Sequence, residues 1–92
     1  MTVKMRFSST MLQFTGELER ELDAGGETIG NILKQLSKEY GDGFRSRLLQ
    51  DGEVRRFINV YIDGEDIRYN GGMDASVPDG AEVSILPAIS GG

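Results

Sequence analysis

The residues with the clearest chemical use are the last six, Pro87 to Gly92, which read "PAISGG". Apart from Pro87 and the medium-sized Ile89, their side chains are small or absent. No predicted element follows Gly91-Gly92, so turn formation does not explain this glycine pair. It is either a frayed end or a functional tail. Such a slim segment could pass along a narrow enzyme channel, whose walls could close on glycine because it has no Cβ.

The group that this tail would deliver is the α-carboxylate of Gly92. A carboxylate resists nucleophiles because oxide is a poor leaving group, whereas AMP in a mixed anhydride is a good one. Adenylation is therefore the chemistry that suits such an end. We expect a bulkier residue at Gly91 or Gly92 to reduce activity far more than stability.

The other candidates for chemistry have structural explanations that we favour. The glycine pairs at 25–26 and 71–72 lie between predicted elements, where glycine supplies turns, and no pair forms a phosphate-binding motif. The acidic clusters are expected to be solvated, because without a pocket nothing raises a carboxylate pKa; they comprise Glu17, Glu19, Glu21, Asp63, Glu65 and Asp66. The basic pairs Arg55-Arg56 and Lys34/Lys38 are also expected on solvated faces, with docking to a partner as the alternative.

Composition excludes several classes of function. The sequence has no cysteine and no histidine, which removes disulfides, thiolate nucleophiles, zinc-type metal sites and imidazole acid/base chemistry. We therefore expect that the protein is not an enzyme, that it has no catalytic side chain and that it binds no metal. The formal charge of -5 disfavours nucleic acid, whose phosphates would repel the protein. This charge either favours a partner with a basic docking face or only keeps the protein soluble.

Length and patterning predict one small domain. The chain has 92 residues, 38% of them hydrophobic, and its apolar runs are far shorter than the roughly 20 residues that cross a bilayer. The amino end lacks the apolar run of a secretory signal. We therefore expect a cytoplasmic protein with no membrane partner, made of a domain over 1–86 and a flexible tail over 87–92.

The elements follow from periodicity and turn signals. Alternating apolar residues predict strands over 2–7 and 15–22, paired as a hairpin and joined by a polar loop. Thr28 is the predicted N-cap of a helix over 29–40 that Gly41 ends. A helical turn over 44–50 follows, and the remaining strands are expected at 56–62, which we place at the centre, at 66–69 and at 81–87, where Pro87 stops pairing. This order predicts an α+β, β-grasp fold, in which a mixed sheet of four to five strands wraps around one main helix.

Phe57 and Tyr61 lie on the same side of the strand over 56–62, opposite its β-branched residues. An apolar face of this kind would suit docking to a larger enzyme. The alternative is that these side chains belong to the core.

The strand order and the terminal Gly91-Gly92 resemble the ubiquitin-like sulfur-carrier family, which contains the MoaD, ThiS and CysO groups. The stretch from Arg56 to Gly92 carries most of the resemblance, through its strand, its acidic turn, its "GG" and "DG" turns and its "LPAxxGG" ending. This tail differs from molybdopterin-type carriers, many of which have two prolines before the glycines. It also lacks the arginines that precede the glycines of ubiquitin.

The resemblance implies a carrier that is a cosubstrate and binds no cofactor. An ATP-using activating enzyme of the MoeB/ThiF type would adenylate Gly92, and a sulfurtransferase or other sulfur donor would convert it to a thiocarboxylate. The acceptor would be a cysteine synthase, the large subunit of molybdopterin synthase or a similar enzyme, with this chain as a possible small subunit. Access and threading would fall to Gly91, Ser90, Ile89, Ala88 and Pro87. A ubiquitin-like modifier joined through Gly92 to lysines and an inert β-grasp interaction domain are the alternatives.

Overall fold

The computed structural model describes residues 1–88. Its strands are β1 (Val3–Phe7), β2 (Glu19–Leu22), β3 (Leu49–Gln50), β4 (Glu53–Val54), β5 (Ile58–Ile62), β6 (Glu65–Asp66) and β7 (Glu82–Pro87). Its α-helices are α1 (Leu12–Thr15), α2 (Ile29–Tyr40) and α3 (Asp42–Leu48), and the 3-10 helices are η1 (Ser9–Met11), η2 (Ile67–Tyr69) and η3 (Gly72–Asp74). No helix within this described part of the chain is long and apolar enough to cross a membrane.

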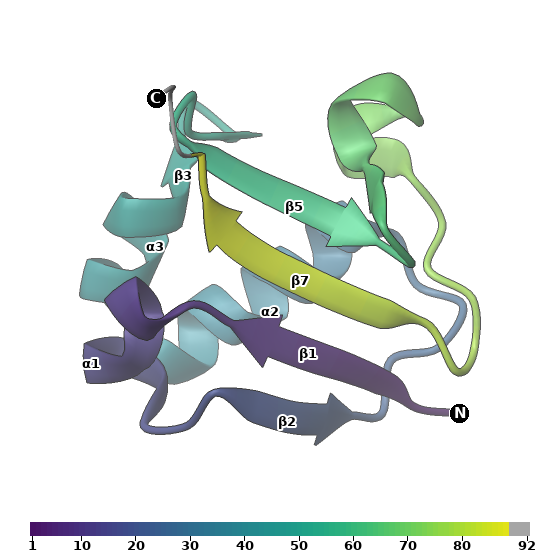
Figure 1. The fold of residues 1–92 in the computed structure, drawn as a ribbon, viewed down its shortest axis with the longest axis horizontal. Coiled ribbons are helices and arrows are strands. Elements are labelled where there is room, and N and C mark those ends of the chain that lie inside the picture. The colour runs from purple at the N-terminus through teal and green to yellow at the C-terminus, as the bar shows by residue number, and fades with distance from the viewer. Residues whose placement is uncertain (89–92) are drawn as a thin grey trace.

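The main sheet has five strands in the order β2-β1-β7-β5-β6, and β3 and β4 form a separate small hairpin. β1 and β7 run parallel, while the other pairs in the main sheet are antiparallel. Helix α2 lies behind this sheet, and α1 and α3 lie at the end where β1 and β7 finish (Figure 1). The predicted mixed sheet wrapped around one main helix is confirmed.

The core lies between α2 and one face of the sheet. Strand β1 alternates buried and exposed residues and β5 alternates buried and half-buried ones, which confirms the period-two prediction for both. Thr28 caps α2 as predicted, since its side chain accepts a hydrogen bond from the backbone N–H of Asn31. The fully buried large side chains are Phe44, Met5, Met11, Ile29, Ile32, Leu33, Leu36, Leu48, Ile85, Val3, Val60 and Val77.

Two tight connections depend on backbone conformations that glycine favours. Gly41 ends α2 and begins α3 with φ 96° and ψ -177°, a region that is almost restricted to glycine. Asp63 and Gly64 both have positive φ and form the two-residue loop between β5 and β6, as expected for a hairpin turn that follows the twist of its strands. These turns lie where the sequence predicts them.

Several predicted elements differ from the structure. The stretch expected to be a polar loop after β1 forms η1 and α1, because Met11 is buried in the core. The predicted strand over 66–69 ends at Asp66, whose side chain accepts from the N–H of Arg68 and starts η2 instead. The strand over 56–62, which is predicted at the centre, is the fourth of the five strands as β5. The third and central strand is β7, with β2 and β1 on one side and β5 and β6 on the other.

The expectation that Pro87 stops strand pairing is wrong on the side of β5. Pro87 is the cross-strand partner of Ile58, and the N–H of Ala88 donates to the carbonyl of Phe57 at 2.7 Å. Pairs in an antiparallel ladder are alternately hydrogen-bonded and non-hydrogen-bonded. Because Ala88 and Phe57 form a bonded pair, the next pair, Pro87 with Ile58, is a non-bonded one, and the missing N–H of Pro87 costs no hydrogen bond there. The ladder therefore continues to Ala88.

Candidate functional site

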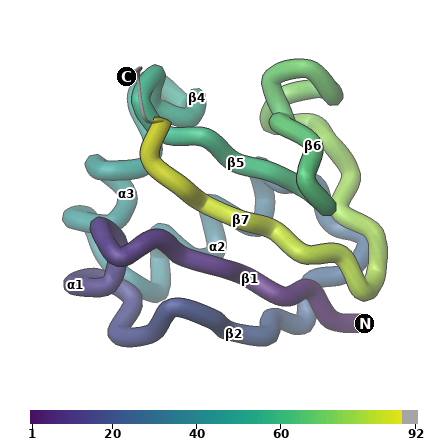
Figure 2. Tube along the Cα trace, viewed as in Figure 1, coloured from purple at the N-terminus to yellow at the C-terminus, as the bar shows by residue number. Residues whose placement is uncertain are grey.

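The base of the predicted tail lies at the end of β7. The last residues of this strand run beside the first residues of β5 (Figure 2), and Ala88 is held there by the carbonyl of Phe57. Pro87 and Ala88 are both half-buried. The remaining predicted tail residues, Ile89, Ser90, Gly91 and Gly92, lie outside the described residues, and their roles stay predictions.

Beside this base lie the two aromatic residues that the sequence singles out, Phe57 in the turn before β5 and Tyr61 on the outer face of that strand. Phe57 is 66% exposed, and Tyr61 is half-buried with its hydroxyl in a hydrogen bond from Asn59. Leu86, which pairs with Asn59 across the strands, adds an exposed apolar side chain that the sequence analysis missed. The core residues of β5 point the other way, so Phe57 and Tyr61 are not core side chains. Their docking role stays a prediction.

The two arginines that precede Phe57 make different contacts. The guanidinium of Arg56 lies 5.7 Å from the centre of the Phe57 ring, within the range of a cation–π contact. The side chain of Arg55 is exposed and donates to the carbonyl of Ser46 at 2.6 Å, which links the segment before β5 to α3. Both arginines are exposed, as predicted.

Arg68 is a residue of this region that sequence reasoning missed. Its guanidinium donates to the side-chain oxygen of Asn59 at 2.6 Å, to the carbonyl of Arg55 at 3.0 Å and to the carbonyl of Ile58. Asp66 lies 3.7 Å from the same guanidinium. These bonds tie η2 to the segment that leads into β5. A side chain that bonds to backbone carbonyls leaves no periodic signal in a sequence.

The acidic clusters behave as surface and structural groups. Glu17, Glu19 and Glu21 are exposed, as predicted. Asp63 accepts from the N–H of Glu82 at 3.0 Å and so joins the β5–β6 turn to β7. Within residues 1–88, no group of three or more Asp or Glu side chains is placed to hold a metal ion.

A hollow of about 520 Å³ lies between α2, α3 and the β3–β4 turn. Lys34, Lys38 and Arg45 border it, with Leu49 and Met73 among its apolar lining residues. The three cationic residues are exposed, as predicted for the two lysines. None of the residues at the tail base lines this hollow, so it is separate from the site at the end of β7.

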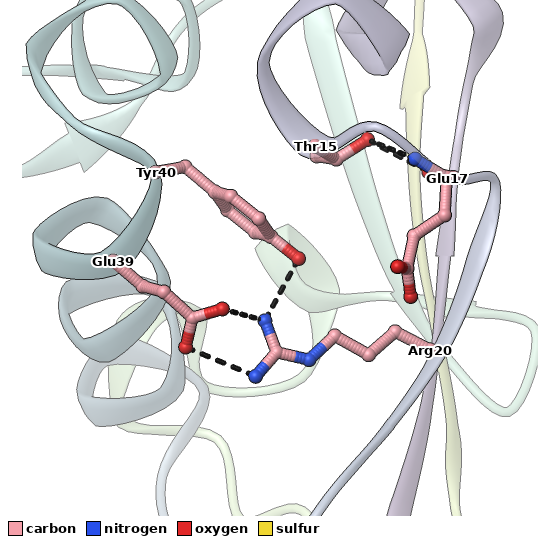
Figure 3. Close-up of polar contacts among 5 residues, drawn as sticks. All are labelled: Thr15, Glu17, Arg20, Glu39 and Tyr40. Carbon is pink, nitrogen blue, oxygen red and sulfur yellow. Dashed lines mark hydrogen bonds and ion pairs between the residues drawn. The ribbon is translucent and has the colours of Figure 1, made fainter.

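A second polar network lies at the opposite edge of the sheet, on β2. Arg20 donates to both carboxylate oxygens of Glu39 and, at 2.8 Å, to the hydroxyl of Tyr40 (Figure 3). These hydrogen bonds lower the pKa of Glu39 below its usual range, and the bond to Glu39 is the main cause of the raised pKa of Arg20. The network ties β2 to the end of α2 and is structural.

Comparison with known proteins decides the family. The model of the ThiS family matches residues 5–92, which include the terminal glycine pair. The chain belongs to the ThiS family. This membership confirms the resemblance to ubiquitin-like sulfur carriers that the sequence shows, and with it the β-grasp fold.

Relatives of this ThiS family member include carriers and modifiers. The chain is 34% identical to the sulfur carrier protein CysO of Mycobacterium tuberculosis, and 33% identical to small archaeal modifier protein 3 of Haloferax volcanii. Each match covers 100% of both chains. A solved BexX/CysO complex of Amycolatopsis orientalis contains a chain with a TM-score of 0.82 and 35% identity, over 98% of this chain and 99% of that one. The findings support a sulfur-carrier or ubiquitin-like role, in a class of small carriers that are not catalysts.

Proposed function

We propose that this protein is a sulfur carrier whose cargo is held as a thiocarboxylate at Gly92. The observation that carries the proposal is the family match, which runs through Gly92 in a chain that aligns over its full length with a named sulfur carrier. The structure adds a base from which such a tail would leave the domain, where the N–H of Ala88 bonds to Phe57.

The proposed chemistry has two steps. In the first, a carboxylate oxygen of Gly92 attacks the α-phosphorus of ATP, the bond to the β-phosphate breaks and pyrophosphate leaves. In the second, sulfide attacks the acyl carbon, the carbon–oxygen bond to AMP breaks and AMP leaves. The product is a thiocarboxylate, and no redox reagent is needed. The carrier contributes its terminus and its docking surface, and an activating enzyme contributes the catalysis.

The proposed partners follow from these two steps. An adenylating enzyme of the MoeB/ThiF type binds ATP, a sulfurtransferase or other donor supplies the sulfur, and an acceptor enzyme consumes it. The BexX/CysO complex of Amycolatopsis orientalis supports the proposal that such a carrier binds a partner protein. We propose the exposed surface at Phe57 and Tyr61 as the docking site, because Phe57 is a large exposed apolar side chain next to the tail base.

Mass spectrometry of the intact protein tests the function. After incubation with an adenylating enzyme of this type, ATP and sulfide, the chain should gain the mass difference between one sulfur and one oxygen. A chain that lacks Gly91-Gly92 is the control and should gain nothing. If the intact chain shows only its carboxylate under all these conditions, the carrier function is wrong.

The modifier named among the relatives supports a second candidate function. In that reaction, a lysine amine attacks the acyl carbon of adenylated Gly92, the carbon–oxygen bond to AMP breaks, AMP leaves with loss of the amine proton, and an isopeptide bond forms. Conjugates of higher mass in cells, absent when Gly91-Gly92 is deleted, would support it. An inert interaction domain is the remaining alternative, and it predicts that the same deletion changes nothing.

A further inference from the structure

The side chain of Arg68 connects three parts of the fold near the tail base. The residue lies in η2, and its guanidinium reaches the carbonyl of Arg55 at 3.0 Å, the carbonyl of Ile58 and the side chain of Asn59 at 2.6 Å. Asp66, at 3.7 Å, partly balances its charge. Arg68 thus spans the whole segment that enters β5.

This segment is also the one that holds the tail base. Phe57 lies between the two residues whose carbonyls Arg68 binds, and its own carbonyl accepts the N–H of Ala88 at 2.7 Å. On the other side, Arg55 donates from its backbone to Leu48 at 2.8 Å and from its side chain to Ser46. The position of the Phe57 carbonyl therefore depends on contacts from η2 and from α3.

The geometry requires an arginine. One terminal nitrogen of Arg68 donates to two backbone carbonyls while the other donates to Asn59, which uses the planar fork of a guanidinium. A lysine ammonium is a single charged point and cannot reach acceptors spread over this distance in the same way. The turn before β5 is closed by its own backbone, since the N–H of Ile58 donates to the carbonyl of Arg55 at 3.0 Å, and Arg68 adds a second donor to that carbonyl.

We propose that Arg68 is a positioning residue for the C-terminal tail. It fixes the turn over residues 55–58, which places the carbonyl that holds Ala88 and presents Phe57 to a partner. Arg68 thus fixes, through Phe57, the position of Ala88 at the base of the tail. The functional part of this inference rests on the proposed carrier function, and the structural part does not.

The structural part is tested by amide hydrogen exchange on the full chain. In Arg68→Met, the Ala88 amide should exchange about tenfold faster than in the unmodified protein, the effect of weakening one to two hydrogen bonds. Arg20→Met is the matched control, because Arg20 makes as many side-chain bonds but at the far edge of the sheet. Exchange of the Leu33 amide, inside helix α2, corrects both variants for global stability. If, after this correction, Ala88 exchanges equally in both variants, the inference is overturned.

Arg68→Lys gives a second variant that keeps the charge. It should leave the protein folded and still fail to restore the protection of Ala88, because the fork is lost. Full restoration of Ala88 protection by lysine would show that charge alone matters and would contradict the positioning role.

The functional part is tested by measuring steady-state adenylation by an activating enzyme of the MoeB/ThiF type, with pyrophosphate exchange as the readout. Arg68→Met should lower kcat about tenfold or more, since a misplaced reacting group is costly, whereas Arg20→Met should stay within about twofold. Unchanged kcat in Arg68→Met would overturn the functional part. If the unmodified chain is never adenylated, the carrier function itself is wrong, and hydrogen exchange alone then decides the structural role of Arg68.

Discussion

The guanidinium of Arg56 lies over the ring of Phe57, with 5.7 Å between Cζ and the ring centre. This pair stands at the start of β5, and the carbonyl of Phe57 holds Ala88 at the base of the tail. An exposed aromatic ring beside a cation has the composition of an interface anchor. A partner that receives the tail would therefore meet Phe57 at the same time.

Truncation of Phe57 tests this surface. Because Phe57 is 66% exposed, Phe57→Ala should change the free energy of unfolding by only about 0.5 kcal/mol, while the KM for adenylation rises about tenfold. Tyr69→Ala is the matched control, since Tyr69 is an aromatic side chain that is 90% exposed. Steady-state kinetics with varied carrier concentration measure the effect. Equal KM values for the two variants would remove Phe57 from the docking surface.

Substitution of Gly91 tests the tail. Gly91→Val adds a branched side chain where the proposed channel closes on the backbone, so adenylation should fall on the order of a hundredfold, with Gly91→Ala intermediate. The free energy of unfolding should change by less than about 0.5 kcal/mol, because the role proposed for Gly91 is in adenylation and not in folding. Wild-type adenylation of Gly91→Val would argue against a narrow channel.

Removal of the α2 cap tests the local basis of the main helix. Thr28→Ala removes the acceptor of the Asn31 N–H, 3.2 Å away, and should lower the free energy of unfolding by about 1 kcal/mol. Thr28→Ser keeps the hydroxyl and is the control. Urea denaturation followed by circular dichroism measures both midpoints. If serine and alanine destabilise the protein equally, the cap contributes little.

The predicted elements that are correct have strong local signals. β1 and β5 alternate along their length, and α2 combines a capping threonine, a helical apolar stripe and a terminal glycine. The short β3 and β4 strands of two residues each are below the length at which alternation carries information. The helical turns after β1 form because tertiary packing buries Met11, which its polar neighbours do not reveal.

In the candidate site, too, the features with a local sequence signal could be predicted and those that depend on tertiary contacts could not. The sequence indicates the chemical character of the tail from residue size alone, and it places Phe57 and Tyr61 on one side of a strand. It does not show that Pro87 falls at a pair position that needs no hydrogen bond, because this depends on the register between β5 and β7. It also does not reveal Arg68, whose partners come from residues nine to thirteen positions away.

The pH dependence of stability tests the Arg20–Glu39 network. Hydrogen bonds from Arg20 lower the pKa of Glu39 below its ordinary value of 4.5, so the folded state binds a proton there less readily than the unfolded state. This stabilisation is fully present above pH 4.5 and is lost as the pH falls through the lowered pKa of the folded state. Glu39 is 45% exposed and solvent screens the pair, so Glu39→Gln should cost about 0.2–1 kcal/mol at neutral pH. The difference between the two proteins should shrink toward zero in acid, measured by urea denaturation at several pH values. Glu21→Gln is the control, because Glu21 follows Arg20 on strand β2 but lies outside this network, and it should not lower the free energy of unfolding in this way. A difference between wild type and Glu39→Gln that does not change with pH would contradict an ionic contribution.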